Sequence, residues 1–245
     1  MAKRHQNLKQ TNFMKPFFVN LLLLSVLTNF ASAQNQLSKT EQKQGWKLLF
    51  DGKNTAGWHS YLQPKAAPAW MVADGALKLD PKADGQADLL TDKEYENFEL
   101  ALEWKISAEG NSGVIFGVHE DPEFKATYDT GIEMQVLDNK GAEDNKKATH
   151  LAGSLYDMKA PSAEVAKPAG EWNMAKIRKE KGHLTFWLNG TKIVETQMGS
   201  PEWETLISNS KFKTWKNFAK YPKGHIALQD HGHDVSFRDI KIREL

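Results

Sequence analysis

The chain has 245 residues and no cysteine, and 26% of its residues are charged with a formal net charge of +1 at pH 7. Without cysteine there is no disulfide framework and no thiolate metal site. A charge this close to zero gives no electrostatic reason for binding nucleic acid or an anionic membrane. The length is sufficient for one self-contained domain.

Residues 1–33 predict a cleavable secretory signal. Four basic residues precede an apolar run of 14 residues over 17–30, which is followed by the small residues Ala31-Ser32-Ala33. This is the order of a signal peptide, and the run is shorter than the roughly 20 residues of a membrane-spanning helix. We therefore expect cleavage between Ala33 and Gln34 and a secreted or periplasmic protein. The remaining chain has 28 basic and 31 acidic residues, hence a formal charge of −3.

Residues 34–44 are polar and have no periodicity, which predicts a flexible lead-in to one domain over residues 45–245. From there apolar and polar residues alternate, most clearly over Phe98–Ile106, as in half-buried strands. Asn189-Gly190 between two apolar runs predicts a hairpin, because this dipeptide suits a type I′ turn. The expected strands, in chain order, are Trp70–Val72, Leu77–Leu79, Phe98–Ile106, Val114–Val118, Ile132–Leu137, Leu184–Leu188, Lys192–Val194, His225–Gln229 and Val235–Ile242.

Helical spacing of apolar residues is absent apart from a short stretch over residues 202–208. Many short strands without helices predict an all-β fold of two packed antiparallel sheets, a sandwich or jelly roll. The charged segment over residues 139–147 is interpreted as a solvated hairpin end.

Seven stretches of the sequence, in this order, carry a resemblance to a known family: "GWKLLFDGKNTAGWHSY", "NFELALEWKISAEGNSGVIFGV", "YDTGIEMQVLDN", "HLAGSLYDM", "GEWNMAKIRK", "WLNG" and "GHIALQDHGHDVSFRDIKIREL". Together they span residues 45–245 and resemble the 3-keto-disaccharide hydrolase family, also described as 3-keto-glycoside 1,2-lyases and 3-keto-2-hydroxy-glucal hydratases. The resemblance implies a concanavalin A-like (LamG-like) jelly roll, usually exported, in glycan-degrading bacteria. It also implies an oligosaccharide or glycoside substrate and a partner sugar 3-oxidoreductase. The weakly acidic charge of the chain without its signal predicts no nucleic-acid or membrane partner.

The implied chemistry has defined requirements. A ketone at C3 acidifies the hydrogen on C2, so that the glycosidic oxygen on C1 can leave by elimination, and water then adds to the enone. Such a site needs a general base near C2, a cation or hydrogen-bond donors for the enolate oxygen, and an acid for the leaving group.

Candidate residues follow from strand alternation and from the resemblance. Over Ile132–Leu137 the alternation separates a dry face from a face carrying Glu133 and Gln135, and after Leu228 it places Gln229 and His231 on one side. Histidine titrates near neutral pH and suits acid-base work. We expect Glu133, His150 and His231 to be catalytic, and the substrate-binding residues to be Asn111, Gln135, Asp138, Tyr156, Lys211 and Gln229.

Alternatives remain open at this point. No cofactor is required and no metal ligand is assigned, although residues 229–234 leave a divalent metal possible. A non-catalytic carbohydrate-binding module would use aromatic platforms, for which Trp203 and Trp215 are candidates. An ordinary concanavalin-like glucanase would use a Glu-x-Asp-x-x-Glu strand, but here Gln135 stands in place of the middle aspartate.

Overall fold

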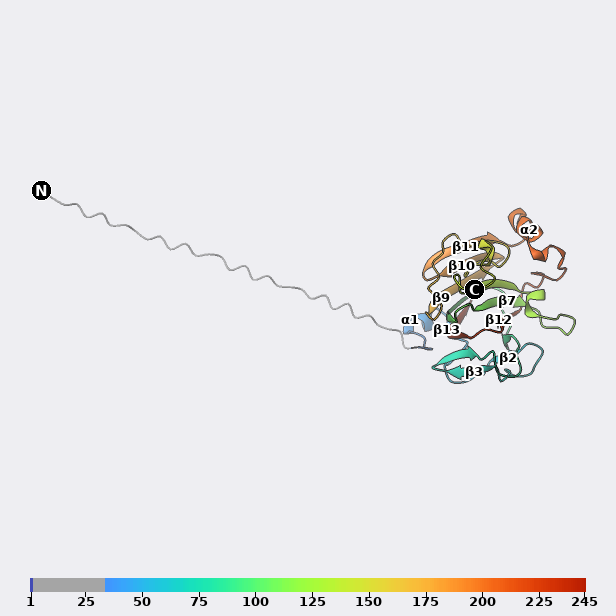
Figure 1. The fold of residues 1–245 in the computed structure, drawn as a ribbon, viewed down its shortest axis with the longest axis horizontal. Coiled ribbons are helices and arrows are strands. Elements are labelled where there is room, and N and C mark those ends of the chain that lie inside the picture. The colour runs from blue at the N-terminus through green and yellow to red at the C-terminus, as the bar shows by residue number, and fades with distance from the viewer. Residues whose placement is uncertain (2–33) are drawn as a thin grey trace. The chain divides into compact units, whose positions relative to one another are not determined.

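The computed structural model describes Met1 and residues 34–245, so the predicted signal peptide lies outside the described residues apart from Met1. Residues 34–245 form two antiparallel β-sheets that pack face to face (Figure 1). The predicted all-β sandwich is therefore confirmed. No helix in this part of the chain is long and apolar enough to cross a membrane.

The larger sheet has eight strands. Seven run in the order β11-β10-β9-β6-β13-β4-β3, and β1 also pairs with β13. Their bounds are β1 Lys47–Leu48, β3 Trp70–Ala73, β4 Ala76–Leu79, β6 Phe98–Ile106, β9 Asn173–Glu180, β10 His183–Leu188, β11 Thr191–Gln197 and β13 Val235–Glu244.

The smaller sheet has five strands in the order β2-β5-β12-β7-β8. Their bounds are β2 Trp58–Ser60, β5 Leu89–Thr91, β7 Asn111–Val118, β8 Ile132–Leu137 and β12 His225–Leu228. One face of this sheet packs on the larger sheet, and its other face carries the site described below.

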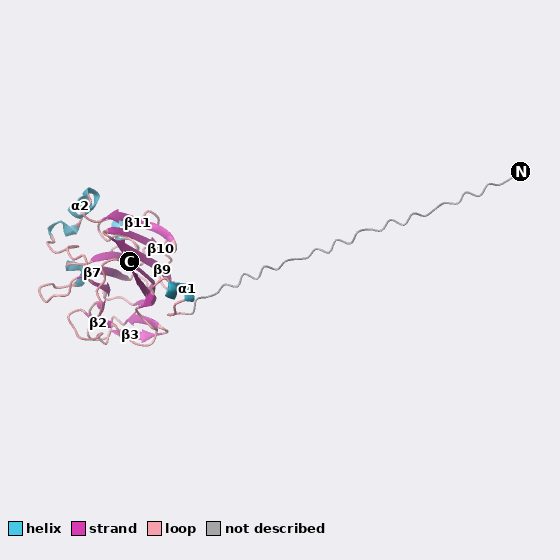
Figure 2. Cartoon of the chain, turned by 180° about the vertical axis from the view of Figure 1, so that it is seen from behind, coloured by secondary structure: helices cyan, strands magenta, loops and turns pink. Residues whose placement is uncertain are grey.

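Helices are few and short (Figure 2). They are α1 Lys39–Lys43, α2 Pro201–Ser208 and the 3-10 helices η1 Thr127–Asp129, η2 Ala148–His150 and η3 Lys211–Thr214.

The prediction that residues 34–44 contain no regular element is wrong, because α1 lies within them. Ser38 and Glu41 form a reciprocal capping box at its start, which satisfies backbone N–H groups that a helix end leaves open. Glu41 also pairs with Lys241 of β13, and the Asn35 amide donates to the Gly75 carbonyl at 2.8 Å. The segment is thus attached to the larger sheet, a tertiary effect that its polar composition does not reveal.

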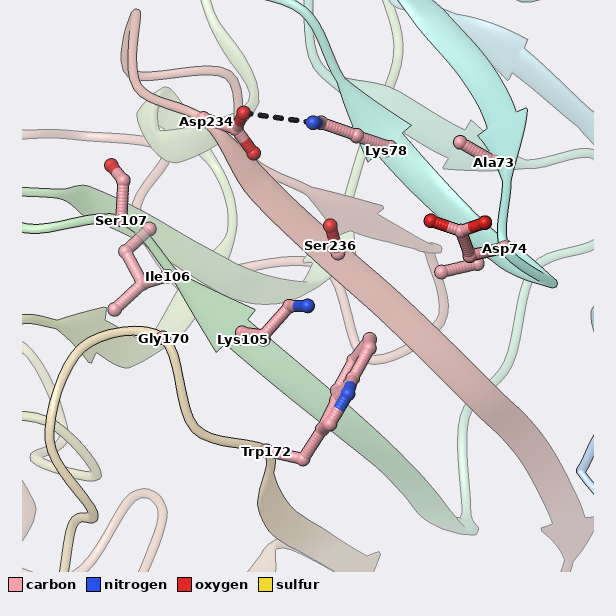
Figure 3. Close-up of a pocket in the computed structure, with 11 residues that line it drawn as sticks. Ala73, Asp74, Lys78, Lys105, Ile106, Ser107, Gly170, Trp172, Asp234 and Ser236 are labelled. Atoms are coloured by element: carbon pink, nitrogen blue, oxygen red, sulfur yellow. Dashed lines mark ion pairs between the residues drawn. The ribbon is translucent and has the colours of Figure 1, made fainter.

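The outer face of the larger sheet holds a shallow cavity of about 300 Å³ (Figure 3). Lys78 Nζ pairs with Asp234 Oδ2 at 2.9 Å. The Trp172 ring lies 4.0 Å from the Arg238 guanidinium and 4.9 Å from Lys105 Nζ. Lys78, Lys105 and Asp234 of this cavity are therefore already engaged within the protein.

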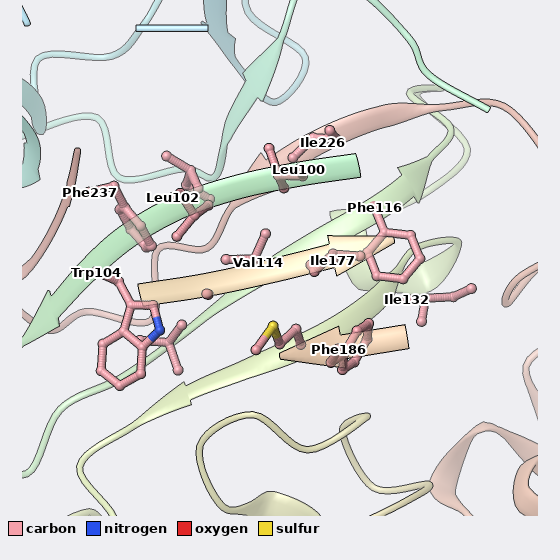
Figure 4. Close-up of a cluster of buried hydrophobic side chains, with 14 of the residues drawn as sticks. Leu100, Leu102, Trp104, Val114, Phe116, Ile132, Ile177, Phe186, Ile226 and Phe237 are labelled. Atoms are coloured by element: carbon pink, nitrogen blue, oxygen red, sulfur yellow. The ribbon is translucent and has the colours of Figure 1, made fainter. Parts of the chain in front are cut away.

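The core lies between the two sheets (Figure 4). Phe116 of β7 makes edge-to-face contacts with Phe98 and Phe186 of the larger sheet, with ring centroids 5.9 and 6.1 Å apart. Such pairs add about 0.5–1.5 kcal/mol to the stabilisation from burial. On β8, Ile132 and Met134 face this core, so the side chain of Glu133 between them points away from it.

The predicted strands are confirmed, with β6 and β8 at the expected bounds, β12 ending at Leu228 and β13 extending to Glu244. Strands β1, β2, β5 and β9 were not predicted. The first three are only two or three residues long, and in β9 basic residues occupy several positions. One of them, Lys179, is buried, and its Nζ donates to the Glu96 and Pro222 carbonyls at 2.8 and 2.6 Å. Burial lowers the pKa of Lys179.

Candidate active site

A cavity of about 330 Å³, here called the inner cavity, lies on the face of the five-stranded sheet turned away from the core. Its ionisable residues are Glu133, Lys211 and His231. Its amides are Asn111, Gln135 and Gln229, and its aromatic residues are Tyr128, Tyr156 and Trp215. Seven of these nine residues are among the predicted catalytic and substrate-binding residues, and Trp215 was a candidate aromatic platform.

Strand alternation directs Glu133 and Gln135 into this cavity, because their neighbours Ile132, Met134 and Val136 belong to the core. The opposing strand β7 has glycine at position 113. A Cβ atom on Gly113 would lie 2.8 Å from Glu133 Cδ and 2.9 Å from Cγ. The Glu133 side chain therefore lies over a backbone that only glycine leaves open.

Glu133 is a buried carboxyl group without a hydrogen-bond partner in residues 34–245, and 7% of the residue is exposed. Burial raises its pKa to about 8, because the charged form loses solvation. The Lys211 ammonium opposes this shift, whereas Asp88 and Asp144 add to it. A carboxyl group with a pKa near the working pH is suited to general base catalysis.

Lys211 brings a cation beside Glu133. Although the residue is solvent-exposed overall, its Nζ lies 4.3 Å from the Tyr156 ring centroid and 5.7 Å from that of Trp215. Burial lowers the pKa of Lys211, and Glu133 opposes this shift. The backbone N–H of Lys211 donates to Asp157 Oδ2 at 2.7 Å, which fixes η3 at the cavity.

The segment 153–156 continues the small sheet beyond β8. The Gln135 N–H donates to the Ser154 carbonyl at 3.1 Å, and the Gly153 N–H donates to the Gln135 carbonyl at 2.8 Å. The Tyr156 N–H donates to the Glu133 carbonyl at 3.1 Å. Backbone pairing thus places the Tyr156 ring beside Glu133.

Behind Tyr156 lies a chain of hydrogen bonds. The Tyr156 hydroxyl donates to Asp144 Oδ2 at 2.9 Å. His150 Nδ1 is 2.6 Å from Asp144 Oδ1, and His150 Nε2 is 2.7 Å from Asp157 Oδ1. Burial and the hydrogen bond to Asp144 raise the pKa of Tyr156, so its hydroxyl remains protonated. His150 supports the cavity from behind and does not line it.

Asp138 is the other predicted residue that the structure keeps out of the inner cavity. The alternation of β8 stops at Leu137, which is buried in the core. The Asp138 carboxylate then accepts backbone N–H groups of Glu109 at 2.9 Å and Lys140 at 3.1 Å. Asp138 holds a turn, a common use of aspartate where a strand ends.

Tyr128 and Trp215 form the aromatic part of the inner cavity, with ring centroids 6.0 Å apart. Tyr128 was not predicted, since it lies in the short 3-10 helix η1, outside the alternating strands. Trp203 was a candidate platform, and this prediction is wrong, because only 3% of the residue is exposed and it packs in the core.

A second, outer cavity of about 530 Å³ adjoins the inner one and shares Asn111, Tyr156 and His231 with it. Asp144 also lines this outer cavity. The segment 139–147, interpreted from its charge as a solvated hairpin end, therefore contributes to the site. Among the described residues no cluster of three or more His, Cys, Asp or Glu side chains has the geometry of a metal site.

Substitution of Gly113 by alanine is expected to displace the Glu133 carboxyl. Because misplacement of a reacting group by about 1 Å costs as much as 10²-fold in rate, kcat/KM should fall at least about tenfold. The free energy of unfolding should fall by about 1–3 kcal/mol through overpacking. The double variant Gly113→Ala/Glu133→Ala should regain that stability, and a stability that stays low would show that the clash is not with Glu133.

His150→Ala is expected to lower the free energy of unfolding by about 1–3 kcal/mol, because Asp144 and Asp157 lose their shared donor. Chemical denaturation measures this, with the exposed His183→Ala as the matched control. Lost turnover with unchanged stability would instead place His150 in the chemistry.

The fold and the cavity define a class: an all-β sandwich of two antiparallel sheets, with amides, a buried carboxyl and aromatic rings lining a cavity suited to a polyhydroxy ligand. A sequence profile of the 3-keto-alpha-glucoside-1,2-lyase-like domain matches residues 45–243. The chain therefore belongs to the 3-keto-alpha-glucoside-1,2-lyase-like domain family.

Individual relatives agree with this assignment. A Bacteroides thetaiotaomicron protein named 3-keto-disaccharide hydrolase is 32% identical over 242 residues, covering 88% of this chain and 83% of the relative. A crystal structure from Parabacteroides distasonis, assigned to the glycosyl hydrolases, is 32% identical with a TM-score of 0.80 and covers 86% of this chain and 99% of its own. A second structure from that organism, with the same assignment, is 30% identical with a TM-score of 0.65, covering 82% and 99%.

Proposed function

We propose that the protein cleaves 3-keto-glycosides by elimination between C1 and C2, followed by hydration of the enone. The observation that carries this proposal is the Glu133 carboxyl, buried and without a hydrogen-bond partner in residues 34–245, which lines the inner cavity together with the Lys211 ammonium. Deprotonation beside a ketone requires a base and a cation for the enolate oxygen. These two residues supply both.

The steps assign one role to each group. Ionised Glu133 takes the proton from C2, and the electron pair moves onto the ketone oxygen at C3, where Lys211 stabilises the enolate. When the enolate collapses, the C1–O bond breaks, its electron pair leaves with the glycosidic oxygen, and that oxygen takes up a proton. Water then adds across C1 and C2 of the enone, which gives the free 3-keto sugar and makes the net reaction a hydrolysis.

His231 is the proposed acid for the leaving oxygen. It lies where the inner and outer cavities meet, which is where a bond between two sugar rings would cross from one cavity to the other. Imidazole gives and takes protons readily near neutral pH. The amides of Gln135 and Gln229 are placed to hold the oxidised ring.

An ordinary retaining glucanase fits this site poorly. That mechanism requires two carboxyl groups about 5–5.5 Å apart, whereas among the described residues Glu133 is the one carboxyl group that lines the inner cavity. Gln135 occupies the neighbouring position on the strand, and Asp138 holds a turn. The oxidised sugar avoids this requirement, because its ketone activates the substrate.

The test is incubation of the protein with a 3-keto-disaccharide and with its unoxidised parent, each with and without EDTA, followed by mass spectrometry of the products. We expect cleavage of the keto form alone. Products formed in H₂¹⁸O should carry the label at C1 of the keto sugar. Cleavage of the parent would favour the glucanase, and binding of the keto form without cleavage would favour a carbohydrate-binding module. Loss of turnover with EDTA would add a divalent metal to the proposal.

Two further parts of the proposal concern the setting of the enzyme. The substrate must come from an oxidation of the C3 hydroxyl, so we expect a sugar 3-oxidoreductase to act before it. We also propose export with cleavage after Ala33. N-terminal sequencing of the protein recovered outside the cytoplasm should start at Gln34, and a start at Met1 would contradict export.

A further inference from the structure

The outer cavity is lined by three acidic side chains. Glu109, Glu143 and Asp144 line it together with His231 and His233, and no lysine or arginine is among its lining residues. Lys211 lines the inner cavity but not the outer one. Among the described residues, the inner cavity therefore combines Glu133 with a lysine, whereas the outer cavity has carboxylates and no lysine or arginine beside them.

Two of these carboxylates have no hydrogen-bond or ion-pair partner within residues 34–245. Glu109 and Glu143 are exposed, and in residues 34–245 neither side chain forms a hydrogen bond or an ion pair. Asp144 differs, since its oxygens face His150 and Tyr156. Glu109 and Glu143 are thus available as acceptors for a ligand in the outer cavity.

A second feature independently indicates a ligand at the junction of the cavities. Asn111 is 6% exposed and lines both cavities, and its Oδ1 is buried without a hydrogen-bond partner in the described part of the chain. A buried acceptor left unpaired is unfavourable. A donor on a bound ligand would satisfy this oxygen, so the junction favours a ligand with N–H or O–H groups.

From these observations we propose that the outer cavity binds the leaving group of the substrate and selects by charge. It favours glycosides whose leaving sugar carries an amino group, accepts neutral leaving sugars, and disfavours uronic acids and sugar phosphates. This inference rests on the proposed 3-keto-glycoside cleavage. An ammonium has three donors and no acceptor, which matches the two unpaired carboxylates and the Asn111 oxygen.

The test uses three 3-keto-glycosides that share the oxidised ring and carry glucose, glucosamine or glucuronic acid as leaving sugar. We expect kcat/KM for the glucosamine compound to exceed that for the glucuronic acid compound roughly tenfold at low salt, from two exposed charge contacts. The ratio should shrink as salt is added. In Glu109→Gln/Glu143→Gln it should fall towards one, whereas the matched double variant Glu123→Gln/Glu164→Gln, which changes two exposed acids outside both cavities, should keep it.

Equal kcat/KM values for the three compounds, or a ratio that survives in Glu109→Gln/Glu143→Gln, would overturn the charge selection while leaving the cleavage reaction intact. Absence of cleavage of all three compounds would instead overturn the proposed function. In that case the charge selection can still be tested by following the binding of free glucosamine, glucose and glucuronic acid to the protein by NMR. The amino sugar should bind most tightly and the acid most weakly, and any other order contradicts the inference.

Discussion

Glu133→Gln is expected to lower kcat/KM for a 3-keto-disaccharide by about 10²- to 10⁴-fold, the usual contribution of a general base. The amide keeps the shape of the side chain and cannot take the C2 proton. In the wild-type enzyme kcat/KM should rise with pH along a limb centred near the Glu133 pKa of about 8. Steady-state kinetics from pH 6 to pH 9 measure both effects, and activity retained in Glu133→Gln would remove Glu133 from the mechanism.

The same variant should be more stable than the wild type at high pH. The pKa of Glu133 is raised from 4.5 in the unfolded chain to about 8 in the folded protein. Between these values the folded protein binds more protons than the unfolded chain, so the contribution of Glu133 to stability falls as pH rises. Glutamine does not titrate. The Tm of Glu133→Gln minus that of the wild type should therefore grow from pH 5 to pH 8, and the exposed Glu123→Gln should show no such trend.

Lys211→Met is expected to lower kcat about 10²- to 10³-fold, as loss of one group that stabilises a developing oxyanion commonly does. It should also move the rising limb of the pH profile to higher pH, because the Lys211 ammonium lowers the pKa of Glu133. Methionine keeps much of the apolar stem that packs on Tyr156 and Trp215. Pre-steady-state kinetics with the keto-disaccharide separate kcat from binding.

The matched control is Lys213→Met in the same 3-10 helix, since Lys213 is exposed and does not line the inner cavity. It should leave kcat and the pH limb as in the wild type. A Lys211→Met enzyme with reduced kcat but an unmoved limb would mean that the ammonium acts on substrate without tuning Glu133.

Strand alternation was enough to place the floor of the site. Glu133 and Gln135 line the inner cavity because they share one face of β8. Gln229 and His231 also line it as expected, although both lie beyond β12, which ends at Leu228. The rule depends on a period of two and fails where a strand ends. Asp138 lies one residue beyond the end of β8 at Leu137, and its carboxylate accepts the Glu109 N–H instead of lining the inner cavity.

Residues outside the strands could not be placed by strand alternation. Tyr128 and Asp144 reach the groove through tertiary contacts, and Asp144 is held by Tyr156 and His150. The position of His150 between two carboxylates likewise depends on folding of the whole segment. A local pattern has no information on such distant pairings, which is also why the attachment of α1 to the sheet was missed.

The pairing of segment 153–156 with β8 has a consequence for solubility. β8 is the last strand of its sheet, and an uncovered edge strand can template pairing with another molecule. The backbone of Gly153, Ser154 and Tyr156 occupies that edge. Variants that detach this segment should therefore self-associate as well as lose Tyr156 from the cavity, and their activity should be judged only on the fraction that stays monodisperse in size-exclusion chromatography.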